Sequence, residues 1–106
     1  MLDQLKILHY NMGKRKLVHW SVLNDSELEH FDAIAILEPY IYKDLADDKP
    51  TQGNHRNWNI YLPTTQRTGG HIRHSYRAAI WVNRTVQAQQ IPIDSYDMVA
   101  VIITGK

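Results

Sequence analysis

The sequence predicts an α/β fold of the α+β type, with one mixed sheet and a helix on one of its faces. Two apolar runs of strand length, residues 5–11 and 33–38, flank a stretch whose apolar residues recur with helical spacing. A strand–helix–strand unit of this length forms a right-handed crossover, so the two strands should be parallel neighbours. Further apolar runs joined by short turns should add antiparallel strands to a single domain that spans residues 1–106.

The first three elements follow from the spacing of apolar residues. Residues 5–11 predict a buried strand, and residues 14–23 predict a helix whose apolar positions are Leu17, Val18, Trp20 and Val22. Asn24-Asp25-Ser26 should end this helix, because these side chains compete with the helical backbone for hydrogen bonds. Residues 33–38 are apolar almost without interruption, as expected of a strand that is covered on both faces.

The rest of the chain alternates between loops and short strands. Residues 43–56 carry the Asp, Lys, Pro, Gly and Asn residues that are typical of a loop. Strands are then expected at 58–62, 77–83, 86–91 and 98–104, with a mobile hairpin loop at 64–74. Trp20, Trp58 and Trp81 are expected to pack in the core or between helix and sheet, rather than to stack on bases.

Charge is balanced over the whole chain but unevenly distributed along it. Twelve Lys and Arg residues and eleven Asp and Glu residues give a formal net charge of +1. No acidic residue occurs between Lys49 and Ile93, and a separate basic run follows Gly13. Such asymmetry indicates contact with a polyanion such as DNA. The residues expected to bind DNA are Lys14, Arg15, Lys16, Arg73 and Arg77. The alternative is an ordinary solvated surface with acidic groups supplied by neighbouring segments.

The composition also bears on location and on partners. The chain has no cysteine, which excludes disulfides and thiolate metal sites and is typical of an intracellular protein, nuclear or cytoplasmic. No run approaches the ~18 apolar residues of a membrane span. The first residues, Met1-Leu2-Asp3-Gln4, lack the basic region of a signal peptide. We therefore expect no membrane partner.

Both leading strands end in a polar residue that can bind a cation. Asn11 closes the first strand and Glu38 closes the second. Because the carboxyl ends of parallel strands meet at one end of a sheet, these oxygen-bearing side chains should lie close together, as a hard cation requires. The alternatives are a plain strand-end carboxylate at Glu38, kept extended by Pro39, and a turn-forming Asn11 before Gly13.

The two segments resemble the opening of the endonuclease/exonuclease/phosphatase superfamily, the fold of apurinic and deoxyribonuclease-I-like endonucleases. The likeness is to endonuclease domains of fungal non-LTR retrotransposon polyproteins, which have motifs like L-K-I-L-Q-Y-N and D-I-L-A-I-Q-E-P-W. Leu5 to Asn11 and Asp32 to Tyr40 correspond to these motifs. Weaker similarity extends through residues 76–83 and 98–103, so that the chain maps onto the amino-terminal half of such a domain.

The resemblance implies a divalent-metal-dependent endonuclease that hydrolyses DNA phosphodiesters. Glu38 would coordinate Mg²⁺ or Mn²⁺, and Asn11 would support the metal or orient a phosphate. His9 and Leu37 depart from the family pattern, which has Gln at both positions, so the groups that orient the site are altered. The family's later N-V-Y-like, D-x-N and S-D-H motifs do not occur. We therefore expect a truncated domain that binds the metal weakly and is inactive by itself.

The implied architecture is half of a four-layer α/β/β/α sandwich, which would leave one apolar sheet face uncovered. We expect a homodimer through that face. Two other function classes stay open. One is a non-catalytic, domesticated module that binds nucleic acid or another partner, and the other is a phosphoesterase of the same superfamily. His9 is expected to be a hydrogen-bonded sheet or core histidine, and His71 and His74 to belong to a basic loop, since a third zinc ligand is lacking.

Overall fold

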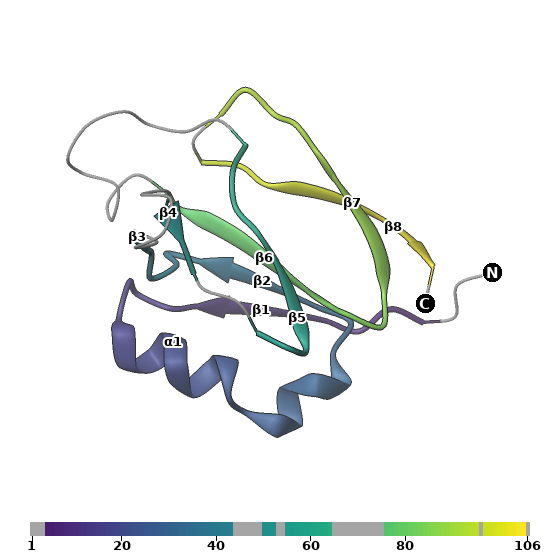
Figure 1. Cartoon of the computed structure of the whole chain (residues 1–106), viewed down its shortest axis with the longest axis horizontal. Coiled ribbons are helices and arrows are strands. Elements are labelled where there is room, and N and C mark those ends of the chain that lie inside the picture. Colours follow the sequence, from purple (N-terminus) through teal and green to yellow (C-terminus); the bar gives the residue numbers. More distant parts are fainter. Residues whose placement is uncertain (1–3, 44–49, 53–54, 65–75, 96, 106) are drawn as a thin grey trace.

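The structure, a computed structural model, describes residues 4–43, 50–52, 55–64, 76–95 and 97–105. In chain order its elements are β1 (Ile7–Asn11), α1 (Lys16–Leu23), the 3₁₀-helix η1 (Ser26–His30), β2 (Ala33–Leu37), β3 (Tyr42–Lys43), β4 (Pro50–Thr51), β5 (Trp58–Tyr61), β6 (Ala78–Asn83), β7 (Gln87–Ile91) and β8 (Ala100–Gly105). Figure 1 shows a central sheet with α1 on one side and the β7–β8 hairpin on the other. The predicted α+β fold, with a mixed sheet and a helix on one face, is confirmed.

The central sheet has the strand order β1-β2-β6-β5. β1 and β2 are parallel, with Ile7 opposite Ala33 and Asn11 opposite Leu37, as a strand–helix–strand crossover predicts. β6 runs antiparallel to both β2 and β5. β7 and β8 pair with each other in a separate two-stranded sheet. The carboxyl ends of β1 and β2 therefore meet the start of β6 at one end of the central sheet.

The face of the central sheet toward α1 carries the main core. Strand residues alternate between the two faces, and the buried set on this face includes Ile34 and Ile36 of β2 and Ala79 and Trp81 of β6. Ile34 and Trp81 have no exposed surface. The core is completed by Trp58 of β5 and by three residues in and near α1: Met12, Val22 and Leu23. The prediction that Trp58 and Trp81 pack in the core is confirmed.

The start of α1 is set by the backbone conformation of the residues before it. Gly13 and Lys14 have φ angles of 61° and 56°, which are left-handed values that a right-handed helix does not accept. Arg15 is extended and forms the N-cap, so that α1 begins at Lys16. The prediction of a helix from residue 14 is therefore wrong by two residues.

The buried stripe of α1 also differs from the prediction. It consists of His19, Val22 and Leu23, at spacings of three and four residues. The expected packing positions Leu17 and Trp20 lie outside this stripe, and their side chains are 83% and 38% exposed. A histidine takes the place in the core that the apolar pattern assigned to these residues.

His19 lies in an aromatic enclosure between α1 and the sheet. Its ring centroid is 4.8 Å from that of Trp20, 5.6 Å from that of Tyr40 and 5.7 Å from that of Trp81. Neither ring nitrogen has a hydrogen-bond partner among the described residues. Burial lowers the pKa of His19 to about 4, and the backbone of Gln52, which favours the charged ring, offsets only part of this effect. The ring is therefore neutral near neutral pH.

Gln52 is a buried polar residue whose hydrogen bonds connect separate parts of the fold. It follows β4, within the segment predicted to be a loop, and is 1% exposed. Its Oε1 accepts a hydrogen bond of 2.9 Å from Nε1 of Trp81 in β6. Its Nε2 donates a hydrogen bond of 3.1 Å to the carbonyl oxygen of Tyr40, which follows β2. Because both ends of the amide are bonded, its burial carries little penalty.

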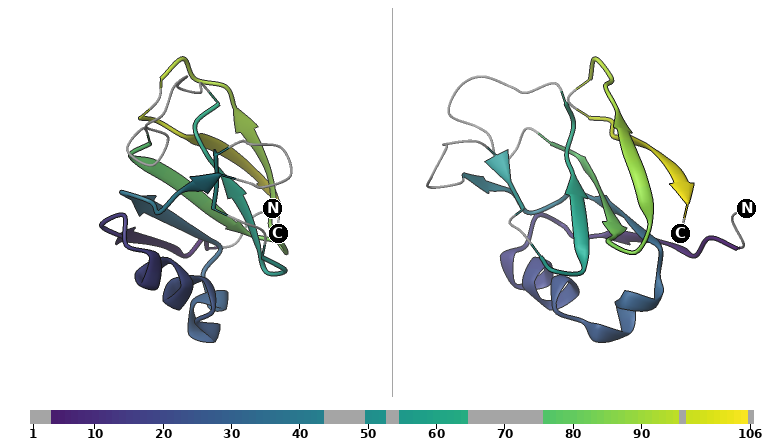
Figure 2. Two further views of the ribbon diagram at one scale, coloured as in Figure 1. Left: turned by 60° about the vertical axis from the view of Figure 1, so that its left-hand side comes forward. Right: turned by 45° about the vertical axis from the view of Figure 1, so that its right-hand side comes forward.

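The opposite face of the central sheet is covered only in part. Figure 2 shows the β7–β8 hairpin lying over this face, where Ala33 and Val82 pair with each other and are 4% and 0% exposed. On the same face, Ile7 of β1 and Leu37 at the end of β2 remain 49% and 51% exposed. The hairpin therefore protects the middle of the sheet but leaves the side chains of β1 and of the strand ends open to solvent.

Candidate metal and nucleic-acid site at the strand ends

The two polar residues that close the leading strands lie at the same end of the central sheet. Asn11 is opposite Leu37 in the β1–β2 register, so Glu38 follows directly after the residue paired with Asn11. A hydrogen bond of 2.8 Å from the N–H of Met12 to the carbonyl oxygen of Leu37 continues the pairing past the end of β1. The predicted proximity of Asn11 and Glu38 therefore rests on direct strand pairing.

Glu38 has a left-handed backbone with φ of 51°. Such a conformation is uncommon for a residue with a side chain, and here two backbone hydrogen bonds hold it. The N–H of Glu38 donates to the carbonyl oxygen of Arg77 at 3.0 Å, and the N–H of Lys14 donates to the carbonyl oxygen of Glu38 at 2.8 Å. The expectation that Pro39 keeps Glu38 extended is therefore wrong, because tertiary hydrogen bonds override the local preference.

Asn11 forms a turn as well as closing its strand. Its Oδ1 accepts a hydrogen bond of 2.9 Å from the N–H of Gly13, which confirms the turn-forming interpretation. A Cβ atom on Gly13 would lie 3.4 Å from Nε of Arg15 and 4.0 Å from Oδ1 of Asn11. The guanidinium of Arg15 is thus folded back over the turn. One lone pair of the Asn11 oxygen stays available in this arrangement.

Four of the five residues expected to bind DNA lie in the described part of the chain, and the fifth, Arg73, lies outside it. Lys14 and Arg77 are joined to Glu38 by the two backbone hydrogen bonds given above. Arg15 and Lys16 are exposed at the start of α1, whose first turn carries no acidic residue. These basic residues come from two segments far apart in sequence, and the backbone of each segment is hydrogen-bonded to Glu38.

A second carboxylate, which the sequence analysis did not identify, lies near this site. Asp97 Oδ1 is 3.9 Å from Nε of Arg77, and the two side chains are 47% and 77% exposed. Because the pair is open to solvent, it contributes little to stability. The position of Asp97 directly before the last predicted strand was the available signal, since an antiparallel hairpin returns that strand toward the start of β6.

The donor set is small for a metal centre. Within the described ranges, no group of three or more His, Cys, Asp or Glu side chains is placed to hold a metal ion. Glu38 and Asn11 supply a carboxylate oxygen and an amide oxygen, which are the donor types that Mg²⁺ prefers, and Mg²⁺ keeps several waters when it has few protein ligands. The residues present therefore fit a hydrated divalent cation but not a tightly held one.

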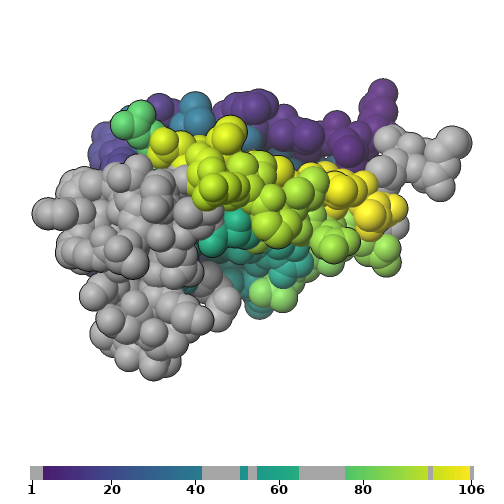
Figure 3. Space-filling view, turned by 90° about the horizontal axis from the view of Figure 1, so that it is seen from above, coloured from purple at the N-terminus to yellow at the C-terminus, as the bar shows by residue number. Residues whose placement is uncertain are grey.

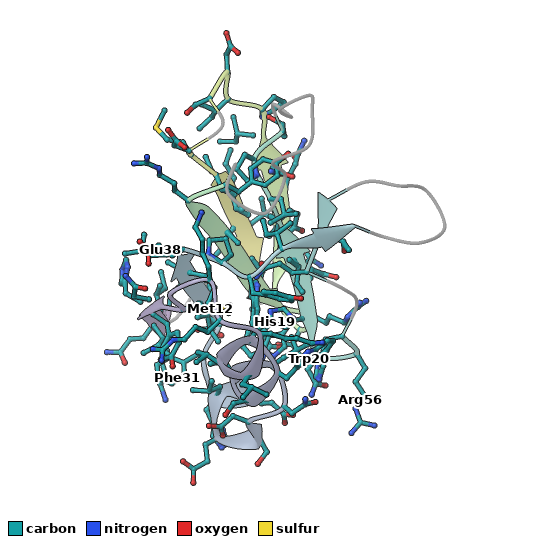
Figure 4. The ribbon with its side chains drawn as sticks, turned by 90° about the vertical axis from the view of Figure 1, so that its left-hand side faces the viewer. Met12, His19, Trp20, Phe31, Glu38 and Arg56 are labelled. Atoms are coloured by element: carbon teal, nitrogen blue, oxygen red, sulfur yellow. The ribbon has the colours of Figure 1, made fainter. Side chains whose placement is uncertain are left out.

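The histidines that the sequence offered as candidates add no ligand to this site among the described residues. Figure 4 shows Glu38 at the end of the sheet, whereas Met12 and His19 lie together between α1 and the sheet. His9 lies on β1, so it is a sheet histidine as predicted, but its side chain is exposed and makes no hydrogen bond among the described residues. The predicted basic loop containing His71 and His74 lies outside the described ranges.

Comparison with known proteins adds no relative. No family model matches the chain, and neither the curated proteins nor the solved structures contain a match. In the part of the chain that the structure describes, neither helix has the length and apolar character needed to cross a membrane.

Proposed function

We propose that the chain carries the metal-binding strand ends of a divalent-metal-dependent endonuclease that acts on DNA phosphodiesters. The observation that carries the proposal is the direct backbone bonding of Glu38 to Lys14 and to Arg77. These backbone bonds bring the segments that carry Lys14 and Arg77 next to Glu38, so that two basic residues are available for phosphate contacts near a metal ion held by its carboxylate. Phosphodiester hydrolysis needs both of these functions at one place.

In this proposal Glu38 holds Mg²⁺ or Mn²⁺ directly, and Asn11 contributes its free lone pair or orients a phosphate. The metal would polarise a phosphoryl oxygen and neutralise developing charge. The guanidinium of Arg15 beside Asn11 favours the phosphate-orienting role, because a fixed cation repels a metal ion but attracts a phosphate. Affinity for the free metal is expected to be in the millimolar range, about that of a single carboxylate with waters.

The 106 residues by themselves are expected to bind DNA without cleaving it. The described residues near Glu38 offer basic residues and one carboxylate, Asp97, which is ion-paired with Arg77, and within the described ranges no three or more His, Cys, Asp or Glu side chains gather. This observation also favours the second candidate function, a non-catalytic nucleic-acid-binding module that uses the same basic surface. A phosphoesterase acting on small phosphates would use the same Glu38, and DNA binding distinguishes the two.

The metal part of the proposal is tested by titrating Mn²⁺ while recording NMR line broadening. Broadening should concentrate on residues 9–11 and 37–39 and should be lost in Glu38→Gln. The matched control is Glu27→Gln, which removes an exposed carboxylate on η1 and should leave the broadening unchanged. Broadening that spares both strand ends would exclude the site.

The DNA part is tested by the salt dependence of binding. Lys16→Gln should lower the slope of log K against log salt by about 0.9, the value for one lost phosphate contact. Arg56→Gln is the control, because Figure 4 places Arg56 away from Glu38 and the variant has the same charge change. Plasmid nicking should stay at background. Mg²⁺-dependent nicking that disappears in Glu38→Ala would show that the chain is a complete nuclease.

We also propose that the chain self-associates through the partly uncovered side of the central sheet. The support is the exposure of Ile7 and Leu37 on the face that the hairpin covers incompletely. Sedimentation at micromolar concentration should find a dimer, and a monomer at all concentrations would contradict this part.

A further inference from the structure

We infer that two copies of the chain join edge to edge through β1, in an antiparallel pair centred on His9. This inference rests on the self-association proposed above but assigns the contact to the free edge of β1 rather than to the face of the sheet, and it is independent of the metal and DNA parts of the proposed function. It specifies which strand pairs, in which direction and in which register.

The backbone of β1 has a free hydrogen-bonding edge. The carbonyl oxygen of Lys6 accepts from Asp32 and the N–H of Met12 donates to Leu37, each at 2.8 Å, so the even-numbered residues of β1 bond to β2. In a parallel pair the alternate residues direct their N–H and C=O groups to the other side. Ile7, His9 and Asn11 therefore present donors and acceptors outward, and β1 has β2 as its neighbour on one side alone among the described strands.

The space beside β1 is open in the described part of the molecule. Figure 3 shows the β1 residues along one margin of the face seen from above, with β8 beside them. The side chains of Ile7, His9 and Asn11 are exposed, and Ile7 is 49% exposed. Residues 7–11 contain no Lys, Arg, Asp or Glu, the side chains that commonly protect an edge strand from pairing.

The edge is complementary to itself. When two β1 strands run antiparallel about His9, His9 faces its counterpart and Ile7 faces Asn11 of the second copy. Each opposed pair exchanges two backbone hydrogen bonds, so every outward group of the three residues finds a partner. The two-fold axis is perpendicular to the sheet, which leaves both hairpins on one side and both α1 helices on the other. A self-complementary patch of this kind closes after two copies rather than growing into a filament.

The side chains support the same register. Asn11 lies opposite Leu37 in its own copy, so Ile7 of the second copy and Leu37 flank Asn11 on one face of the joined sheet. Both are exposed apolar side chains of that face, and pairing covers part of each. No like charges are brought directly opposite one another between residues 7 and 11.

Cysteine crosslinking tests the register, because the chain has no cysteine of its own. Opposed residues in a hydrogen-bonded antiparallel pair have Cα atoms about 5.5 Å apart, within disulfide range. His9→Cys should therefore give a disulfide-linked dimer under mild oxidation. Ile7→Cys and Asn11→Cys should not crosslink separately, since like positions lie about 13 Å apart, but an equimolar mixture of the two should.

Charge placement tests the interface independently of crosslinking. His9→Lys puts two like charges opposite each other and should weaken the dimer about tenfold or more. Gln89→Lys, which adds the same charge on an exposed residue of β7, should leave the dimer unchanged. Monomers at all concentrations would overturn the inference. So would a dimer that crosslinks in another register, or one insensitive to His9→Lys, which would indicate pairing through β8 or another surface.

The metal site provides the control that separates the two proposals. Glu38→Gln should abolish Mn²⁺ broadening and keep the His9→Cys crosslink. If His9→Cys does not crosslink while Mn²⁺ still broadens the signals of the strand ends, the β1 pairing alone is overturned.

Discussion

The two faces of the central sheet are built from the same strands but are protected very differently. On the α1 side, Ile34 and Trp81 are completely buried, and the strands pack against a helix and loops from their own chain. On the hairpin side, Ala33 and Val82 are buried, whereas Ile7 and Leu37 are half exposed. The difference shows that the well-packed core lies on the α1 side of the sheet, whereas the hairpin side keeps apolar side chains in contact with solvent.

The largest expected effect contrasts these faces directly. Ile34→Ala removes a fully buried side chain and should lower the free energy of unfolding by about 2–5 kcal/mol. Ile7→Ala, on the neighbouring strand but the open face, should cost about 1 kcal/mol, in proportion to its smaller burial. Urea unfolding at a chain concentration where sedimentation finds monomer measures both. Equal costs would mean that the open face is covered in solution.

The next effect concerns the pH dependence of stability that arises from His19, on the α1 side of the sheet. The pKa of His19 falls from 6.5 in the unfolded chain to about 4 in the fold, so the unfolded state binds more protons between these values. Stability is therefore complete above the unfolded pKa and is lost as the pH falls, by about 2 kcal/mol between about pH 7 and pH 5. His19→Leu should remove most of this dependence in urea unfolding.

The pKa of His55 is lowered as well, first by burial and then by the nearby charge of Arg56. His55 therefore also makes the fold less stable as the pH falls. The comparison of the native chain with His19→Leu therefore isolates the part due to His19. If the pH dependence of unfolding is unchanged in His19→Leu, the folded chain accommodates protonated His19 without loss of stability.

A smaller effect concerns Glu38, which lies directly after the end of β2. Glu38→Gly relieves the left-handed strain of a residue with a side chain and should stabilise the fold by about 1 kcal/mol. Glu38→Ala keeps the strain and should change stability little. Both variants should lose Mn²⁺ broadening. If Glu38→Gly is not more stable than Glu38→Ala in thermal unfolding, the backbone at this position relaxes in solution.

The smallest effect is expected on the outer side of α1. Leu17 is 83% exposed, so Leu17→Ala should change the free energy of unfolding by less than about 0.5 kcal/mol. The same measurement on Val22→Ala, from the buried stripe, should give a clearly larger loss. A large cost at Leu17 would reveal a contact of α1 that the isolated chain does not show.

The parts of the fold that could be predicted are those governed by local pattern. The β1–β2 crossover and the proximity of Asn11 to Glu38 followed from two apolar runs and from the fixed handedness of such a unit. Polar residues in the core could not be predicted in this way. His19 replaces apolar residues in the buried stripe because aromatic rings surround it, and those rings come from segments distant in sequence.

The strand-end site was predictable in its position but not in its geometry. The local rule for a residue before Pro39 predicts an extended Glu38, whereas hydrogen bonds with Lys14 and Arg77 impose the left-handed conformation. Asp97 was missed for the same reason, since its approach to Arg77 depends on how the hairpin folds over the sheet. Local preference gives way where non-local hydrogen bonds define the backbone.

The buried amide of Gln52 has a consequence for the rate at which the protein opens. Its bond to the carbonyl oxygen of Tyr40 spans 12 residues of sequence, whereas its bond to Trp81 spans 29 residues and can form only after β6 has docked beside β2. Interactions that form late in folding are absent from the transition state, so they slow unfolding while leaving the folding rate nearly unchanged. We expect the hydrogen bonds of Gln52 to slow unfolding and so to prolong the lifetime of the folded chain.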